Sequence, residues 1–369
     1  MRIAFDAKRA FCNNTGLGNY SRTITRGLAE KHPDMSITLI TPKVKSRHKD
    51  FCAGLANVKV VQPKGVWRHL GGFWRTFGIG LDSDDIYHGL SQELPLLIPK
   101  GVHTVVTIHD MMPWRFPENF HLFDRMVYKL KVRRACRVAH SIVAISRQTR
   151  DDIVQFLHID PRSISVIYQS CEPIFRKPVT AEQRSAVRSR YNLPGRYIVS
   201  IGTIERRKNQ ATLVESMLHI DEGVSLVIVG RRTNYANEVD EAIRRNGLEQ
   251  RVRIISDARF EDFPALYAEA EAAAYISLFE GFGIPVLEAM CSGTAVVTSG
   301  CSSMPEVGGD AVLYADPTDA MDVALKINSI ISNNSLRQEL LDKSRQQTMM
   351  FLPESTTEEL YRLYRDLVE

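Results

Sequence analysis

The sequence has no long hydrophobic run and few cysteines, and both absences restrict what the chain can be. Its 369 residues contain no uninterrupted apolar stretch of about 18, which argues against a membrane-spanning helix. The N-terminal residues have a strand pattern without a long apolar run, so we expect no signal peptide. The six cysteines are scattered and form no C-x-x-C pair. That distribution predicts reduced thiols in a cytoplasmic protein, and argues against a disulfide framework or a zinc site.

Composition and charge indicate a globular chain whose two halves differ. Hydrophobic residues make up 44% and charged residues 24%, a balance typical of packed domains. Residues 1–180 hold 27 Lys and Arg against 15 Asp and Glu, whereas residues 181–369 hold 20 against 28. The basic first half predicts an anionic partner, and a nucleic acid, an anionic membrane surface and a phosphate-bearing substrate all qualify.

Short apolar strands alternate with helices in two successive series along the chain. We expect strands at 3–7, 36–41, 85–89, 102–110, 142–146 and 163–168, and then at 196–202, 225–230, 251–256, 272–277, 295–300 and 311–315. Residues 43–80 are weakly patterned, and we expect loops or short helices there. Such alternation predicts parallel sheets with helices on both faces.

An irregular stretch with Pro173 and Pro178 separates the two series and is typical of a linker. We therefore predict an α/β protein of two Rossmann-like, doubly wound domains, residues 1–174 and residues 178–352. The segment 354–369 has an amphipathic helical pattern, and we expect it to pack back on the first domain.

The segment SLFEGFGIPVLEAMCSG at 277–293 carries the strongest functional signal. Glu280 and Glu288 bracket a glycine-containing turn that follows an apolar strand, and open α/β sheets bind ligands at the carboxyl ends of their strands. The two carboxylates could accept hydrogen bonds from sugar or ribose hydroxyls. Backbone N–H groups of the turn would point at an anion, namely those of Phe282, Gly283 and Ile284. On the pattern alone, two surface carboxylates remain the alternative.

Three segments together resemble one known family, namely 277–293, IGTIERRKN at 201–209 and SSMPEVGGDAVLYADPTD at 302–319. They are similar to the retaining glycosyltransferases with the GT-B fold, which include many bacterial mannosyl- and other hexosyltransferases of lipopolysaccharide, capsule and glycolipid assembly. The hallmark of that family is two glutamates separated by seven residues, which Glu280 and Glu288 match. The resemblance spans essentially the whole second half of the chain and recurs in the first.

The resemblance implies a GT-B fold, in which two Rossmann-like domains face each other across a cleft. It implies transfer of a hexose from a nucleoside-diphosphate sugar to a glycan or a lipid-diphosphate-linked acceptor in bacterial surface-polysaccharide synthesis. We favour GDP-mannose as the donor over a UDP-hexose, because the segment at 201–209 is similar to that of mannosyltransferases of such pathways.

Arg207 and Lys208 are the predicted phosphate-binding residues. Two adjacent cations after a strand suit a diphosphate, although such a pair is more often a solvated surface. In the family this pair binds the donor diphosphate. Thr203 stands where some relatives carry a further arginine, and Arg206 is a candidate replacement.

We expect neither a metal ion nor a cofactor, because the two cations would supply the counter-charge for the phosphates. Asp82 and Asp84 have the D-x-D spacing of metal-dependent glycosyltransferases of another fold. They precede the expected strand 85–89 in place of following one, so we interpret them as part of a solvated loop.

His109 ends the expected strand 102–110, where a lone histidine is more often structural. The resemblance implies that His109 faces the reacting sugar and shields the developing charge, while Glu280 anchors the sugar ring. No protein base is then required, because the leaving diphosphate can accept the acceptor's proton. Gly16 and Gly18 belong to an expected loop at 13–18, and the resemblance implies that this loop lets backbone approach the diphosphate and the acceptor.

Two alternatives compete with a transferase. A dinucleotide-dependent oxidoreductase would need a third glycine after Gly16 and Gly18, but Ser21 stands there and the loop begins about eight residues after the strand. A nucleic-acid-binding module would interleave aromatic residues with its cations or carry a zinc or helix-turn-helix signature, and neither pattern occurs. We therefore expect no nucleic-acid partner.

The basic residues of the first half gather in a helical pattern at 125–140. A core-facing amphipathic helix with a solvated basic side explains this pattern. Peripheral contact with anionic lipid explains it equally, and would place a cytoplasmic enzyme at the inner face of the cell membrane. The cations concerned are Arg125, Lys129, Lys131, Arg133, Arg134 and Arg137.

Overall fold

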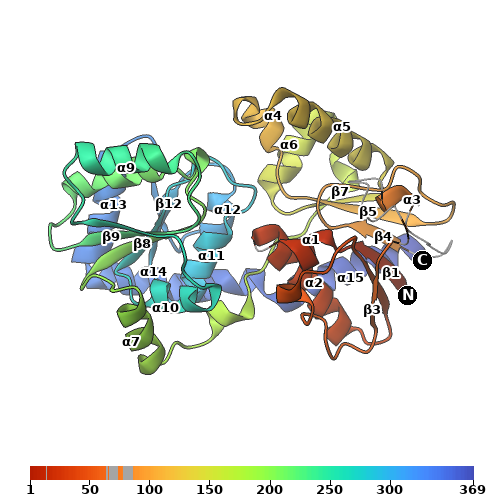
Figure 1. Ribbon diagram of the computed structural model, residues 1–369, viewed down its shortest axis with the longest axis horizontal. Coiled ribbons are helices and arrows are strands. Elements are labelled where there is room, and N and C mark those ends of the chain that lie inside the picture. The colour runs from red at the N-terminus through yellow and green to blue at the C-terminus, as the bar shows by residue number, and fades with distance from the viewer. Residues whose placement is uncertain (14, 64, 66–73, 78–85) are drawn as a thin grey trace. The chain divides into compact units, whose positions relative to one another are not determined.

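The computed structural model describes residues 1–13, 15–63, 65, 74–77 and 86–369. The chain divides into two compact units, which are Met1–Ser170 with Leu352–Glu369, and Cys171–Phe351. Each unit contains one parallel sheet covered by helices (Figure 1). The predicted pair of Rossmann-like, doubly wound domains is therefore confirmed.

The sheet of the first unit has seven parallel strands in the order β3-β2-β1-β4-β5-β6-β7. The central strands are buried on both faces, which explains their nearly continuous apolar sequences. The seven strands are β1 Arg2–Asp6, β2 Ser36–Ile40, β3 Val58–Val61, β4 Ile86–Gly89, β5 His103–Ile108, β6 Ser141–Ala144 and β7 Ile164–Val166.

Strand β3 corrects the expectation of loops or short helices throughout 43–80. It pairs in parallel with β2 at the edge of the sheet, with Ile37 opposite Val58. Its side chains are only half-buried or exposed, because an edge strand has one neighbour, and the sequence therefore lacks a strong apolar pattern. The D-x-D residues at 82 and 84 lie outside the described residues.

The helices of the first unit follow the predicted alternation. Ser146 caps the helix that it precedes, since its hydroxyl accepts a hydrogen bond from the Thr149 amide. The helices are α1 Lys8–Cys12, α2 Gly16–Lys31, α3 Trp74–Phe77, α4 Met112–Arg115, α5 Leu122–Val138, α6 Arg147–Leu157 and α15 Pro353–Val368.

Helix α2 begins earlier than the sequence predicted. The second half of the expected loop at 13–18 is helical, because α2 starts at Gly16. Gly18 permits this tight junction, since a Cβ at that position would lie 2.1 Å from the carbonyl oxygen of Asn13. The glycine-rich segment is thus a close helix–helix connection.

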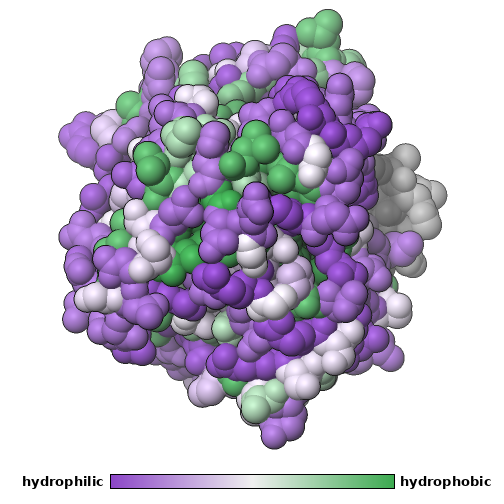
Figure 2. Space-filling model, turned by 90° about the vertical axis from the view of Figure 1, so that its left-hand side faces the viewer, coloured by the Kyte–Doolittle hydropathy of each residue, from purple (hydrophilic) through white to green (hydrophobic). Residues whose placement is uncertain are grey.

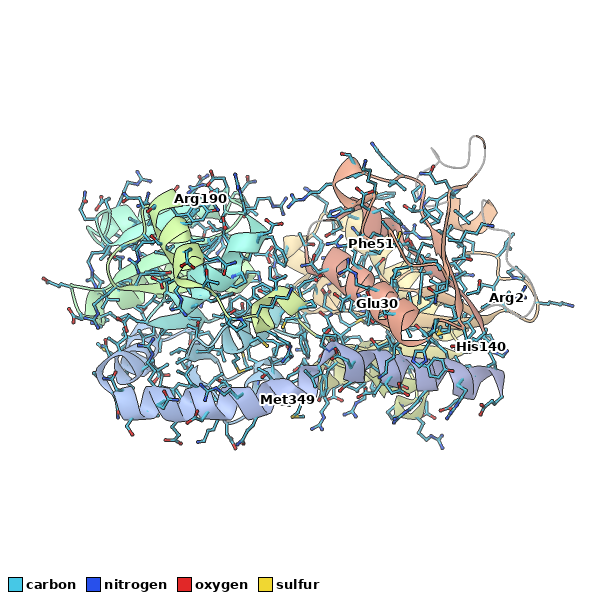
Figure 3. All side chains as sticks on the ribbon, turned by 90° about the horizontal axis from the view of Figure 1, so that it is seen from below. Arg2, Glu30, Phe51, His140, Arg190 and Met349 are labelled. Carbon is cyan, nitrogen blue, oxygen red and sulfur yellow. The ribbon has the colours of Figure 1, made fainter. Side chains whose placement is uncertain are left out.

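The C-terminal helix α15 belongs to the core of the first unit. Its Leu360 and Tyr364 are fully buried in one apolar cluster with Ile3 and Phe5 of β1. Figure 3 shows α15 beside α2, on which Glu30 is labelled, and labels Met349 in the short 3-10 helix η9 (Thr348–Phe351) that precedes α15.

The sheet of the second unit has six parallel strands in the order β10-β9-β8-β11-β12-β13. The strands are β8 Tyr197–Ile201, β9 Ser225–Val229, β10 Val252–Ile255, β11 Ala272–Tyr275, β12 Val296–Ser299 and β13 Leu313–Ala315. The helices are α7 Ala181–Arg190, α8 Gln210–Ser216, α9 Ala236–Arg245, α10 Phe263–Ala268, α11 Ile284–Cys291, α12 Met304–Gly308, α13 Ala320–Ser332 and α14 Asn334–Gln347.

Figure 2 views the second unit from outside and shows mainly hydrophilic residues with smaller hydrophobic patches among them. Across the described parts of both units, none of the helices combines the length and the apolar character needed to cross a bilayer.

Candidate functional site

Two strand ends of the second sheet carry most of the predicted donor-binding residues. Strands β8 and β11 are neighbours, and each is followed by a turn at its carboxyl end. The turn after β8 contains the 3-10 helix η6 (Arg206–Lys208) and ends at Asn209. The Asn209 amide group donates hydrogen bonds to the carbonyls of Ile276 (3.4 Å) and Pro317 (2.6 Å). These bonds fasten η6 beside the end of β11.

The Glu280 carboxylate is the centre of this site. The Tyr275 hydroxyl donates a hydrogen bond to its Oε1 atom at 2.7 Å, and the Ser277 hydroxyl donates another at 3.1 Å. Arg207 forms an ion pair with the same oxygen, and the Nζ atom of Lys208 lies 3.4 Å from it. No hydrogen bond from the described residues reaches Oε2. One carboxylate oxygen is therefore held by four protein groups and the other is left to a ligand.

Charge keeps Glu280 ionised although most of its side chain is buried. Burial raises the pKa of this carboxyl, but the charges of Arg207 and Lys208 outweigh it and lower the pKa to about 2. At neutral pH the side chain is therefore a carboxylate that can only accept hydrogen bonds.

Lys208 is the more deeply buried of the two predicted phosphate-binding cations. Its Nζ atom contacts the Tyr275 hydroxyl and lies 4.7 Å from the centre of the Tyr275 ring. Burial lowers the pKa of this ammonium group, and the Glu280 carboxylate opposes that effect. The tyrosine thus supports the cation through both its ring and its hydroxyl.

Arg207 is held by three acceptors. Its Nη1 atom donates to the Phe279 carbonyl at 2.9 Å, in addition to the Glu280 ion pair, and its Nη2 atom donates to Glu205 at 2.5 Å. Burial opposes its charge, but the carboxylates raise the pKa of the guanidinium above its ordinary value. Arg206, the candidate replacement for a missing cation, instead pairs with Glu238.

The turn after β11 leads into helix α11. Gly283 caps this helix at φ 108°, a left-handed conformation that favours glycine. Ile284 is the first helical residue, and the first amide groups of a helix have no carbonyl partner in a preceding turn. The hydroxyls of Ser302 and Ser303 donate to the Glu280 carbonyl at 2.6 and 2.9 Å and fix the turn.

Glu288 lies within α11, and only 6% of it is exposed. Among the described residues, no side chain or backbone group hydrogen-bonds to its carboxyl. Burial raises its pKa well above the ordinary value, and the neighbouring Cys171 and Glu172 add to that effect. The charge of Lys208 lowers the pKa of Glu288, so the two side chains are close enough to interact electrostatically. A buried carboxyl without a protein partner is a position that a ligand hydroxyl can satisfy.

His109 follows β5 in the first unit and is 5% exposed. Its Nε2 atom lies 2.9 Å from the Leu90 carbonyl, its Nδ1 atom lies 3.0 Å from the Gln169 amide nitrogen, and the Tyr20 ring packs against it edge-on. Burial lowers its pKa to about 4, so the imidazole is neutral at pH 7. Both ring nitrogens already have protein partners.

The structure brings most of the predicted residues together in the second unit: Arg207, Lys208, Glu280, Phe282, Gly283, Ile284 and Glu288. His109, Gly16 and Gly18 belong to the first unit. Gly16 faces open space, whereas the Cβ direction of Gly18 is filled by Asn13.

Sequence reasoning missed four residues that hold Glu280, namely Tyr275, Ser277, Ser302 and Ser303. Tyr275 ends an apolar strand and is indistinguishable there from a core tyrosine. Ser302 and Ser303 begin the segment 302–319 that resembles the family, and this position could have indicated that they belong to the site. Among the described residues, no cluster of three or more His, Cys, Asp or Glu side chains could hold a metal ion.

Comparison with known proteins agrees with this geometry. Residues 183–347 match the family described as "Glycosyl transferases group 1", and residues 14–172 match "Glycosyltransferase Family 4". The chain is 30% identical over 288 residues to the O-antigen chain mannosyltransferase B of Escherichia coli, covering 76% of this chain and 74% of that protein. It is 29% identical over 224 residues to the O-antigen chain mannosyltransferase RfbU of Salmonella typhimurium, covering 60% and 59%.

Solved structures share the fold. The structure of Anabaena Alr3699/HepE in complex with UDP and glucose superposes with a TM-score of 0.75 at 18% identity, covering 99% of this chain and 100% of that one. The lipopolysaccharide glycosyltransferase WaaG superposes with a TM-score of 0.69 at 14% identity, covering 98% of each chain. At these identities the likeness shows the arrangement of elements.

Proposed function

Because this chain belongs to the group 1 glycosyltransferases and has their GT-B fold, we propose that it transfers a hexose from a nucleoside-diphosphate sugar with retention of configuration. The acceptor is a glycan or a lipid-diphosphate-linked glycan of bacterial surface-polysaccharide synthesis. GDP-mannose is the favoured donor, since both relatives named above are mannosyltransferases, and a UDP-hexose is the alternative. Membership of this family favours a transferase over the oxidoreductase and the nucleic-acid-binding module considered from the sequence.

The observation that carries this proposal is the pair of incompletely satisfied carboxyls beside two partly buried cations. The Oε2 atom of Glu280 and the carboxyl of Glu288 receive no hydrogen bond from the described residues, while Arg207 and Lys208 lie against Glu280. Hydroxyl groups suit the carboxyls and phosphate oxygens suit the cations. A nucleoside-diphosphate sugar contains both kinds of group.

In the proposed mechanism, Lys208 and Arg207 stabilise the charge that develops on the leaving diphosphate. The amide groups of Gly283 and Ile284 at the start of α11 add donors for the same anion. Glu280 accepts hydrogen bonds from hydroxyls of the sugar ring through Oε2, and Glu288 binds hydroxyls elsewhere on the donor. These residues bind, orient and neutralise charge, so no metal ion or cofactor is part of the proposal.

His109 fits a role without proton transfer. Its imidazole is neutral, and its two nitrogens are engaged by Leu90 and Gln169. It therefore cannot take the acceptor's proton without losing one of these contacts. We propose that the leaving diphosphate accepts this proton on the same face of the sugar, and that His109 shields the charge developing on the sugar. Gly16 and Gly18 remain candidates for backbone contact with the diphosphate or the acceptor.

A panel of nucleoside diphosphates tests the proposed function directly. Binding to the folded protein stabilises it by mass action, by about 2.7 kcal/mol at a ligand concentration a hundredfold above Kd. Of GDP, UDP, ADP and dTDP, one should raise the unfolding temperature clearly more than the others, and we expect that nucleotide to be GDP. If none of the four raises the unfolding temperature while a nicotinamide dinucleotide does, the transferase assignment fails.

Replacing Tyr275 with phenylalanine should weaken the site without removing it. The change deletes the hydroxyl between Lys208 and Glu280 but keeps the ring beneath Lys208, so we expect turnover to fall by about tenfold, which corresponds to one hydrogen bond to a charged group. Steady-state kinetics with the identified donor provides the measurement.

Tyr197→Phe is the matched control for this substitution. It also deletes a hydrogen-bonded hydroxyl from a buried tyrosine of the same sheet, but the partner of that hydroxyl is the Leu266 carbonyl. Equal kinetic losses in the two variants would mean that Tyr275 has only a structural role.

We further propose that helix α5 contacts an anionic membrane. The account of a core-facing helix holds for Val132, Ala135 and Cys136, which are buried. It does not hold for four large apolar residues that are 59% to 73% exposed, namely Leu122, Phe123, Met126 and Leu130. Leu96 and Leu97 are also exposed, and Arg134 of α5 donates to the carbonyls of Pro95 and Leu96, which holds this segment beside the helix. Contiguous exposed apolar surface marks interaction sites.

Cations accompany this apolar surface, which explains why lipid is the proposed partner. Arg133 and Arg137 are exposed on α5, and each cation near an anionic bilayer contributes about 1 kcal/mol. The apolar side chains would enter the interfacial layer while the guanidinium groups meet the lipid phosphates. Such contact would place a cytoplasmic enzyme at the inner face of the cell membrane, where lipid-linked acceptors are presented.

Co-sedimentation with liposomes tests the membrane proposal. Binding should rise with the anionic lipid fraction and fall with salt, and replacing Arg133 and Arg137 with glutamine should lower the partition coefficient by roughly thirtyfold. Leu130→Ser should weaken binding as well, whereas Leu325→Ser, at an exposed leucine of α13, should not. Equal binding to neutral and anionic vesicles would contradict the proposal.

A further inference from the structure

Two cysteines that are far apart in the sequence meet in the second unit. The Sγ atoms of Cys171 and Cys291 are 3.4 Å apart, in hydrogen-bond contact. Cys171 is the first residue of the unit and is buried, whereas Cys291 is the last residue of α11 and is partly exposed. The proposed transfer mechanism uses neither thiol.

The surroundings prepare Cys291 to react. The Cys171 thiol donates its hydrogen bond to the Cys291 sulfur, which lowers the pKa of Cys291, and the positive charge of Arg176 acts in the same direction. The pKa of Cys171 is raised correspondingly, so it remains a thiol. Burial and the Glu288 carboxyl oppose this effect without cancelling it. One partner is thus a partly exposed sulfur with a lowered pKa and the other is a protonated neighbour within reach, which is the arrangement of a reacting and a resolving cysteine.

We propose that Cys171 and Cys291 form a redox modification site that hydrogen peroxide or a related hydroperoxide converts to a disulfide. The Cys291 thiolate attacks one peroxide oxygen, the O–O bond breaks, and the departing hydroxide is protonated to water. This leaves a sulfenic acid on Cys291. The Cys171 sulfur then attacks the Cys291 sulfur, and the released hydroxide takes the Cys171 proton to form a second water. The two sulfurs supply the two electrons that reduce the peroxide.

The other thiols do not share this arrangement. Cys12 donates to the Lys43 carbonyl and Cys301 to the carbonyls of Ser277 and Leu278, so neither faces a second sulfur. Burial raises the pKa of the Cys52 thiol, and it raises that of Cys136, in the core of the first unit, to about 12. Oxidation should therefore select the pair at 171 and 291.

The disulfide would connect the start of the second unit to the end of α11 and close a long loop. Closing a loop of more than a hundred residues restricts the unfolded chain strongly, so the unfolding temperature of the second unit should rise by roughly 10 °C. This consequence requires no donor or acceptor and is independent of the proposed function.

The test treats the full-length protein with hydrogen peroxide, removes the oxidant with catalase, and alkylates the remaining thiols after denaturation. We expect loss of two of the six thiols, a crosslinked peptide containing Cys171 and Cys291, and an increase in unfolding temperature that dithiothreitol reverses. Cys52→Ser should behave as wild type, and Cys171→Ser should show neither the crosslink nor the stabilisation. Retention of six thiols, or the same thiol loss and stabilisation in Cys171→Ser, would overturn the proposal.

Discussion

Replacing Glu280 with glutamine should lower turnover by about ten- to a hundredfold. The substitution keeps the shape of the side chain but removes the charge that Arg207, Lys208, Tyr275 and Ser277 surround. A hydrogen bond to a charged group contributes about 1.5 to 3 kcal/mol, which corresponds to this range of rates. The effect should be on kcat more than on KM for the donor, because Glu280 is proposed to contact the reacting sugar.

Glu238→Gln is the matched control for this prediction. It also removes a glutamate paired with an arginine of η6, but the Glu238–Arg206 pair is exposed and exposed pairs contribute little. Its turnover should equal that of the wild type. A Glu280→Gln variant that retains wild-type turnover would contradict the proposed site.

Substitutions of Glu280 should also lower the stability of the folded protein, because the carboxylate neutralises neighbouring cations. Truncating Glu280 leaves Lys208 without its carboxylate partner and Arg207 with only Glu205, and breaking a well-buried ion pair costs about 3 to 5 kcal/mol. Glu280→Ala should therefore unfold at a lower temperature than the wild type, and Glu280→Gln should lie between the two. Circular dichroism must show both variants folded at the temperature of the activity assay.

Replacing Lys208 with methionine should weaken binding of the nucleoside diphosphate by about ten- to a hundredfold. Methionine occupies similar volume but cannot donate to phosphate oxygens, and a charge-assisted hydrogen bond contributes about 1.5 to 3 kcal/mol. Calorimetry with the diphosphate and with the matching monophosphate measures the effect. The wild type should prefer the diphosphate, and most of that preference should disappear in Lys208→Met.

Arg206→Met provides the control for this substitution, because Arg206 lies in the same 3-10 helix but pairs with Glu238. Its affinity for the diphosphate should be unchanged. Equal affinities of the wild type for the diphosphate and the monophosphate would show that the cations do not contact the second phosphate. A wild type that is inactive in EDTA and restored by Mn²⁺ would instead point to the aspartates at 82 and 84.

The order of strands and helices followed from the sequence because each central strand is buried on both faces and has a distinct apolar pattern. Several elements did not, and strand β3 and helix α7 show why. Strand β3 is a half-exposed edge strand, and its sequence VKVV gives little contrast with a loop. Helix α7 has only one buried residue, Val187, and the capping box of Thr180 and Gln183 is its main local signal.

For the site, the sequence predicted which residue types meet but not how they interact. Glu280, Arg207 and Lys208 were assigned from motifs, but their mutual ion pairs depend on the adjacency of β8 and β11. The raised pKa of Glu288 depends on burial and on Cys171, which is remote in the sequence. The exposure of Leu122 and Phe123 was equally hidden, because an apolar residue in an amphipathic helix is expected to face a core.

We propose that the ends of β8 and β11 form the donor site, and hydrogen–deuterium exchange of the full-length protein locates the bound nucleotide. With the nucleoside diphosphate that stabilises the protein most, we expect slower exchange than without it in two segments of the second unit, residues 202–209 and residues 280–288. This protection should be lost in Lys208→Met. Unchanged exchange in both segments at saturating nucleotide would contradict the proposal.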